Sequence, residues 1–143
     1  MKVMVIVKAS ADSEAGAMPG GQLLADMGRF NEELIKAGIL VVAEGLHPSS
    51  KGVRIRFSGS DRSVIDGPFA ETKELVAGFW LWQVESMDEA IAWARRCPNP
   101  MPGVESELEI RPVFDVEAFA NCDPTGKNRA RERQLRAELE AAQ

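Results

Sequence analysis

The stretch Leu75–Glu85, LVAGFWLWQVE, decides the fold. Aromatic and aliphatic residues dominate it, which is typical of a β-strand. Successive side chains of a strand point to opposite faces, so Phe79 and Leu81 share one face. Trp80 and Trp82 share the other. Large apolar side chains on both faces predict a strand in a sheet that is covered on both sides.

A helix and a last strand are predicted after this stretch. Ser86 and Glu89 have the spacing of a capping box, in which the serine hydroxyl accepts the N3 amide and the glutamate reaches back. Apolar residues at helical spacing follow, and Pro98 ends the segment. We expect the last strand over Val104–Phe114, with glutamates at its outward positions.

The N-terminal part predicts a strand, a helix and a second strand. Met1–Lys8, MKVMVIVK, is short, β-branched and apolar on both faces. Ala9–Gly21 contains Ser, Asp, Pro and Gly, and predicts a loop. From Gln22 the apolar residues follow the period of an amphipathic helix, which Gly38 ends with a left-handed cap. A second strand is expected over Ile39–Leu46.

A β-hairpin is predicted between the second strand and Leu75–Glu85. Val53–Ser58 alternates, with apolar side chains on one face and Arg54 and Arg56 on the other. The arginines suit an anionic ligand, solvent or acidic partners such as Glu107. A turn leads into Ser63–Asp66.

This order of elements predicts an α+β protein of the ferredoxin-like type, an antiparallel sheet with two helices on one face. Two helices cover only one face of such a sheet, yet several of its strands are apolar on both. An exposed apolar patch of that size usually marks an interface. We therefore expect a homodimer in which the uncovered faces pack together.

We expect one domain over residues 1–120 and a charged helical tail over residues 121–143. Asp123 fits an N-cap and Pro124 the first helical position. Glu132 and Arg136 stand at the spacing of a helical ion pair. Because the charges of the tail are mixed and aromatics are absent, a solvated helix or a dimer strap is favoured over a nucleic-acid arm.

The composition narrows the classes of function. The net charge of −5 argues against nucleic-acid and anionic-membrane partners. The apolar run Val3–Val7 is too short for a membrane span or a signal peptide, and the separated Cys97 and Cys122 suggest reduced thiols in a cytoplasmic protein. With one histidine and no phosphate- or dinucleotide-binding motif, we expect no metal and no cofactor.

Five stretches together resemble the YCII-related family, in the branch named for its DGPF motif. They are MKVMVIVKA (1–9), AEGLHPS (43–49), VIDGPFAETKE (64–74), GFWLW (78–82) and EIRPVF (109–114). The resemblance covers Met1 to about Phe114, and the consecutive residues DGPFAETKE make it specific. It implies a ferredoxin-like protomer that forms a dimeric α/β-barrel-type assembly.

The resemblance also implies a cleft in which a histidine and an aspartate form an acid/base pair. Lyase-like chemistry on small cyclic compounds is suggested within the wider family, and some members are associated with extracytoplasmic-function sigma factors. In this chain the pair would be His47 and Asp66. Three functions remain open. They are a small lyase- or isomerase-like enzyme, a ligand-sensing or protein-binding module without turnover, and a purely structural dimer, which would leave the polar strand ends unused.

Each residue of this pair also has a structural interpretation. His47 is the single histidine and stands at a strand end, where its imidazole suits proton transfer near neutral pH. Alternatively, it is a passive turn residue before Pro48. Asp66 can orient the imidazole, or its carboxylate can accept amides of the following turn.

Four more residues are candidate ligand contacts: Lys8, Glu44, Ser49 and Phe69. Lys8 and Glu44 lie near strand ends and can line a cleft with His47, or pair with each other at a dimer interface. Phe69 can equally anchor its turn in the core.

Overall fold

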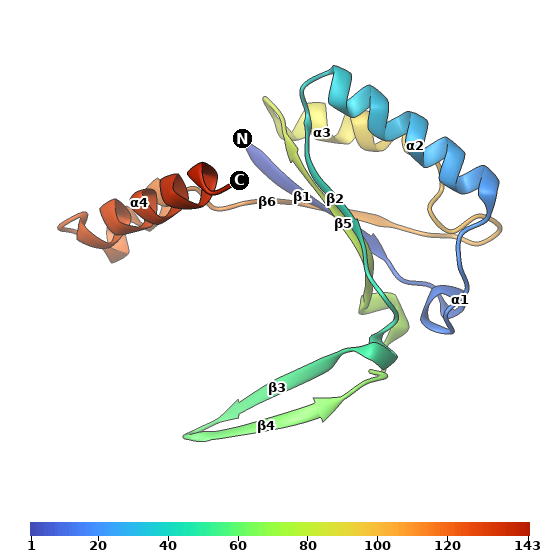
Figure 1. Cartoon of the computed structure of the whole chain (residues 1–143), viewed down its shortest axis with the longest axis horizontal. Coiled ribbons are helices and arrows are strands. Elements are labelled where there is room, and N and C mark those ends of the chain that lie inside the picture. The colour runs from blue at the N-terminus through green and yellow to red at the C-terminus, as the bar shows by residue number, and fades with distance from the viewer. The chain divides into compact units, whose positions relative to one another are not determined.

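A four-stranded antiparallel sheet forms the centre of the first of two compact units, Met1–Pro112 (Figure 1). The computed structural model describes all 143 residues, apart from the side chain of Lys73. The strands of the sheet are β1 (Lys2–Lys8), β2 (Leu40–Gly45), β5 (Val76–Gln83) and β6 (Leu108–Pro112), in the spatial order β2-β5-β1-β6.

Helices α2 (Gly21–Lys36) and α3 (Met87–Ala94) pack on one face of this sheet (Figure 1). Each helix connects two parallel strands that have another strand between them, so two β-α-β units interleave. The prediction of a mixed α+β chain with an antiparallel sheet is confirmed. The left-handed Gly38 after α2, with φ of 73°, is confirmed as well.

Successive side chains of β5 point to opposite faces, as its sequence predicted. Trp80 lies opposite Val5 and Trp82 opposite Val3, and all four side chains are buried beneath the helices. Phe79 occupies the other face and is half-buried. Trp80 is held further, because its Nε1 donates a hydrogen bond to Asn31 Oδ1 on α2 at 2.9 Å.

Side-chain caps refine two predicted boundaries. The expected loop contains one helical turn, α1 (Ala11–Glu14), because the hydroxyl of Ser10 accepts the amide of Ser13 at 3.1 Å. Before α3, the Ser86 hydroxyl accepts the Glu89 amide at 3.1 Å, as predicted. The Glu89 carboxylate reaches back to the amide of Glu85, one residue earlier than a standard capping box requires.

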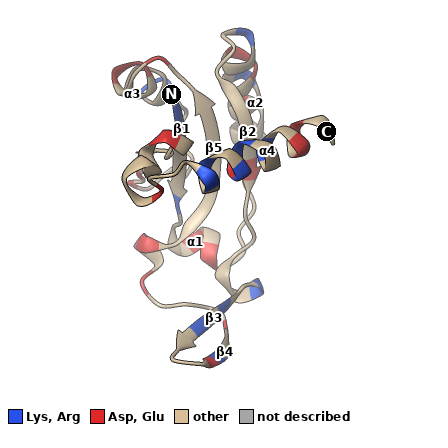
Figure 2. Ribbon diagram, turned by 90° about the vertical axis from the view of Figure 1, so that its left-hand side faces the viewer, with Lys and Arg blue, Asp and Glu red and all other residues tan. Residues whose placement is uncertain are grey.

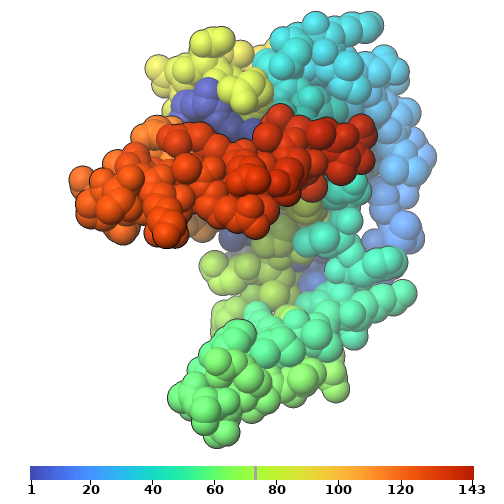
Figure 3. Space-filling view, turned by 60° about the vertical axis from the view of Figure 1, so that its left-hand side comes forward, coloured from blue at the N-terminus to red at the C-terminus, as the bar shows by residue number. Residues whose placement is uncertain are grey.

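The predicted hairpin is confirmed, and it forms a sheet of its own. Strands β3 (Val53–Ser58) and β4 (Asp61–Asp66) pair only with each other in the described part of the chain. The hairpin projects beyond the end of the four-stranded sheet (Figures 1 and 3). We call the segment Val53–Asp66 the arm.

The second unit, Val113–Gln143, contains a 3₁₀ turn (Val116–Cys122) and helix α4 (Lys127–Ala141). The first turns of α4 carry mainly basic side chains and its last turns acidic ones (Figure 2), and Arg136 pairs with Glu132 at 2.8 Å as predicted. No helix in the described part of the chain is long and apolar enough to cross a membrane.

The helix α4 begins later than Asp123 and Pro124 predicted, because Asp123 caps it from outside. The Asp123 carboxylate accepts hydrogen bonds from the backbone amides of Arg129 at 2.9 Å and Asn128 at 3.3 Å. The bond from the Arg129 amide lowers the pKa of Asp123, burial opposes this effect, and the Asn128 bonds add to it.

We therefore expect acid to weaken the start of α4. A carboxyl whose folded pKa is lowered stabilises the fold fully above its ordinary pKa, and this contribution is lost as the pH falls through the lower folded value. Backbone NMR signals of α4 should report fraying on acidification in the wild type. In Asp123→Asn the start of α4 should already be weaker at neutral pH and should respond less to acid. An identical pH profile in both proteins would contradict this role of Asp123.

Candidate functional site

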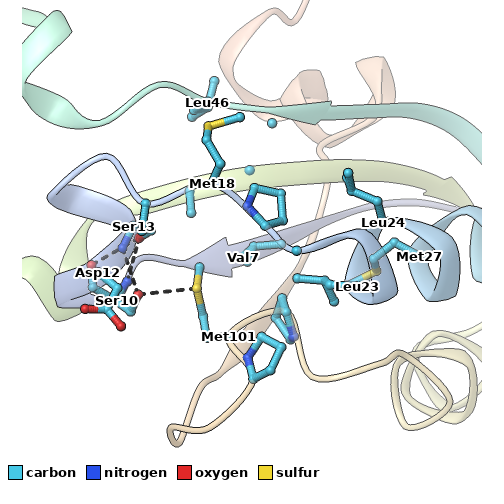
Figure 4. Close-up of a pocket in the computed structure, with 18 of the residues that line it drawn as sticks. Val7, Ser10, Asp12, Ser13, Met18, Leu23, Leu24, Met27, Leu46 and Met101 are labelled. Carbon is cyan, nitrogen blue, oxygen red and sulfur yellow. Dashed lines mark hydrogen bonds between the residues drawn. The ribbon is translucent and has the colours of Figure 1, made fainter.

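A cavity of about 920 Å³ opens within the first unit (Figure 4). Its walls come from the ends of β1 and β2, α1 and the segment that follows it, the first turns of α2, and the loop after α3. Most of the lining is apolar, and it includes Val7, Met18, Leu23, Leu24, Met27 and Met101. A cavity of this size and character suits a small organic molecule, since such sites measure roughly 300–1,000 Å³.

Several polar side chains in the cavity wall already have partners within the protein. The Asn31 side chain accepts from Trp80, Gln22 donates to Asp26, and Ser10 belongs to the cap of α1. Three ionisable side chains remain in the lining without a described hydrogen-bond or ion-pair partner: Asp12, Glu44 and His47. No lysine or arginine lies among the described lining residues.

His47 reaches the cavity because it lies two residues after the end of β2. The chain leaves the sheet after Gly45, and Leu46, His47 and Pro48 all line the cavity. The imidazole is solvent-exposed, so a bound molecule can meet it without a rearrangement of the core. Glu44, at the end of the same strand, also belongs to the lining.

Lys8 lies outside this set. Its ammonium pairs with the carboxylate of Glu109 on the neighbouring strand β6, with an Nζ–Oε1 distance of 3.3 Å. The alternative pairing of Lys8 with Glu44 is therefore not the one present in the protomer.

Asp66 is placed apart from the cavity. It ends β4 opposite Val53, it is exposed, and it is not among the described lining residues. Within the described side chains, no hydrogen bond or ion pair joins Asp66 to His47. The structure thus brings His47 and Glu44 to one cavity and leaves Asp66 at the base of the arm.

The turn after Asp66 is built by Ser49 instead of by an aspartate cap. The amide of Phe69 donates to the Ser49 hydroxyl oxygen at 3.1 Å. The Ser49 hydroxyl in turn donates to Glu14 Oε1, and the Ser49 amide donates to Glu14 Oε2 at 2.9 Å. Ser49 therefore ties the DGPF turn to α1, part of the cavity wall.

The other residues of the DGPF motif pack beside the Ser49 turn, at the base of the arm. The amide of Gly67 donates to the Gly52 carbonyl at 3.0 Å, and the Gly67–Pro68 peptide is cis. The Arg54 guanidinium carbon lies 3.8 Å from the centre of the Phe69 ring, a cation–π contact in place of an anionic ligand or an acidic partner. Ser49 and Phe69 are thus structural contacts in the protomer, outside the described lining of the cavity.

No local signal in the sequence predicts the pairing of Glu14 with Ser49. Glu14 stands in a segment that the composition marked as a loop, and its partner Ser49 is 35 positions away along the chain. Only the folded chain places the two together.

We expect Ser49→Ala to loosen the cavity wall. Its hydroxyl serves as acceptor for Phe69 and donor to Glu14, so its loss should lower the free energy of unfolding by about 1–2 kcal/mol. Hydrogen exchange of the α1 amides should become faster. Ser50→Ala is the matched control, because Ser50 is exposed and has no described side-chain hydrogen bond. Equal effects of the two substitutions would contradict the assignment.

Cys97 offers no nucleophile at neutral pH. Burial raises the pKa of its thiol to about 11, so the thiol remains protonated. The neighbouring Arg96 is engaged elsewhere, over the ring of Trp93 at 4.2 Å and in an ion pair with Glu33. No cluster of three or more His, Cys, Asp or Glu side chains suited to a metal ion occurs among the described residues.

Two comparisons with known proteins each match more than half of the chain. The family model for the YCII-related domain matches residues 1–114. An uncharacterized protein of Rhizobium meliloti (strain 1021) is 36% identical over 92 residues, which are 64% of this chain and 73% of that protein.

Proposed function

Because the chain belongs to the family of YCII-related domains, we propose that it binds a small, mainly apolar molecule in the cavity beside His47. The observation that carries this proposal is the cavity itself. It combines an apolar wall with an imidazole whose ring nitrogens have no described partner in the protein. This is the usual composition of a small-molecule site, in which a few polar groups orient an otherwise apolar ligand.

The charges of the lining narrow the class of ligand. Asp12 and Glu44 are the acidic residues of the lining, although Glu44 lies opposite Phe79 in the strand register, and no described lining residue carries a permanent positive charge. A carboxylate or phosphate on the ligand would be repelled. We therefore expect neutral or cationic molecules to bind in preference to anionic ones.

In the catalytic form of this proposal, His47 transfers a proton to or from the bound molecule. An exposed imidazole can donate or accept a proton near neutral pH, so a bound molecule with an acidic C–H or a leaving hydroxyl could be its substrate. This corresponds to lyase- or isomerase-like proton transfer. In this form of the proposal Asp66 orients the imidazole, which requires the two residues to approach one another.

A second candidate is a ligand-sensing module that binds the same class of molecule without turnover. It is favoured by the separation of Asp66 from the cavity lining and the absence of a described bond between Asp66 and His47. An extracytoplasmic-function sigma factor would be the partner that reads the bound state.

We also propose a ferredoxin-like protomer that works as a homodimer. The interleaved strand order supports the first part. The second is supported by the sheet face opposite the helices, where the apolar side chains include Met4, Ile6, Phe79 and Leu81. Two such faces packed together would remove these side chains from water.

Two fluorescent probes of similar size test the ligand class. N-phenyl-1-naphthylamine is neutral, and 1-anilinonaphthalene-8-sulfonate is anionic. We expect saturable binding of the neutral probe at one site per chain, about tenfold tighter than the anionic probe, which is a difference of about 1.4 kcal/mol. Tighter binding of the anionic probe, or no saturable binding of the neutral one, would contradict the proposal.

A further inference from the structure

We propose that the arm, Val53–Asp66, packs against a second copy of this chain. The inference rests on the proposed homodimer and adds a surface that the sheet face alone does not supply. It starts from the side chains of the arm, which are unlike those of an ordinary solvated hairpin.

One face of the arm exposes a cluster of apolar side chains, flanked on β4 by Arg62 and Asp66, and the Arg62 guanidinium carbon lies 4.6 Å from the centre of the Phe57 ring. Ile55 lies directly opposite Val64 in the strand register, and Val53 and Phe57 flank Ile55 on the same face. The exposed fractions are 58% for Val53, 48% for Ile55, 69% for Phe57 and 67% for Val64. Four contiguous side chains of this kind form a patch, whereas single exposed apolar residues are common on any surface.

Among the described residues, the contacts that support the arm lie at its base. Gly67 bonds to Gly52 there, and Phe69 is held by Ser49 and Arg54. Beyond this joint the two strands pair with no other strand in the described chain, and β3 is exposed along its whole length (Figure 3). A two-stranded hairpin on its own is at best marginally stable in water, so a partner surface would stabilise it.

The areas involved favour a second copy as that partner. These four side chains, exposed by 48% to 69%, amount to an area on the order of 400 Å². A stable interface buries roughly 800 Å² on each partner, so the arm needs a further surface beside it. This chain has one, the apolar sheet face with Phe79 and Leu81. In a two-fold dimer, each copy would contribute both surfaces.

The net charge of the arm also favours a second copy of the chain as its partner. The arm carries three arginines and two aspartates, a net charge of +1, while the chain as a whole carries −5. Arg56 has no carboxylate partner among the described side chains. Glu105 and Glu107, beside the edge strand β6, are exposed and likewise have no described cationic partner. A basic arm on an acidic chain is attracted to the acidic edge of another copy.

The test is the dimer dissociation constant of an arm variant, measured by sedimentation over a range of protein concentrations. In Ile55→Asp/Phe57→Asp the apolar face carries two charges, and we expect the dissociation constant to rise at least tenfold. Ile35→Asp is the matched control: Ile35 is 61% exposed on α2, away from the arm, and its variant should dimerise like the wild type.

Different measurements test the folding of each variant, the arm as an interface and the proposed homodimer. Near-UV circular dichroism of the tryptophans reports whether each variant is folded, and Phe57→Ser carries the same test if the double variant does not fold. A folded arm variant with an unchanged dissociation constant would overturn the arm as interface and leave the sheet-face dimer standing. A wild type that remains monomeric at all concentrations would overturn both, while binding of the neutral probe would still support the cavity.

Discussion

Gly67→Ala is expected to lower the free energy of unfolding by about 1–3 kcal/mol or more, because the added methyl group has no room. A Cβ at this position would lie 1.8 Å from the carbonyl oxygen of Ser49 and 2.7 Å from its carbonyl carbon. Both atoms belong to the backbone, so no side-chain rotation relieves the contact. The turn that carries Ser49 must move, and its bonds to Glu14 and Phe69 should weaken with it.

Gly28→Ala is the matched control for this substitution. Gly28 lies inside α2, and a Cβ there meets nothing within 4 Å. Alanine is favoured over glycine in a helix by about 0.5–1 kcal/mol, so this variant should be more stable than the wild type. Urea unfolding of the two variants measures both effects. Similar stabilities of the two variants would show that the backbone of Ser49 does not require a glycine at position 67.

Leu24→Lys is expected to weaken binding of the neutral probe by about 10- to 100-fold. Leu24 lines the cavity, and the loss of one leucine contact in an apolar site corresponds to about 1.5–3 kcal/mol. The new ammonium would also bring a positive charge to a lining that has none among its described residues. The anionic probe should therefore lose less affinity than the neutral one, or gain some.

Ile35→Lys controls for the added charge and for the exposure of the site. Ile35 is on the same helix and 61% exposed, compared with 59% for Leu24, but it does not line the cavity. Probe titrations followed by fluorescence should give the wild-type affinity for this variant. An equal loss of affinity in both variants would mean that the probe binds elsewhere on the surface.

Residue periodicity predicted the framework of the fold well. The alternation around Trp80 and Trp82, the amphipathic pattern from Gln22 and the cap signal at Ser86 each depend on residues close in sequence. Strand and helix geometry translates such patterns directly into faces and boundaries. The predicted strand after Val104 is shorter than expected, since β6 begins only at Leu108.

The candidate site was only partly predictable, because its parts are brought together by contacts that are distant along the chain. The placement of His47 after a strand could be read locally, and it does line the cavity. One interpretation of Asp66 is a cap for its own turn, which is a local arrangement. The amide of Phe69 instead donates to Ser49, 20 positions earlier in the chain. Glu14 and the cavity depend on packing among α1, α2 and the strand ends, which no local pattern encodes.

The sequence also did not predict that the apolar face of the arm is exposed to solvent. The alternation in Val53–Ser58 predicts one apolar and one polar face, and the register confirms this arrangement. Alternation does not say what covers the apolar face. In the protomer the apolar side chains of this face remain exposed, although Arg62 lies over the Phe57 ring, and the proposed packing on a second copy would cover them.

The most direct test of the central claim is an NMR experiment on the imidazole of His47 while the neutral probe is added. The chain has one histidine, so the assignment is unambiguous. If the cavity beside His47 is the binding site, the ring signals shift in proportion to the bound fraction, and Leu24→Lys requires more probe for the same shift. Ring signals that stay unchanged while the probe saturates the protein would place binding elsewhere and contradict the proposed function.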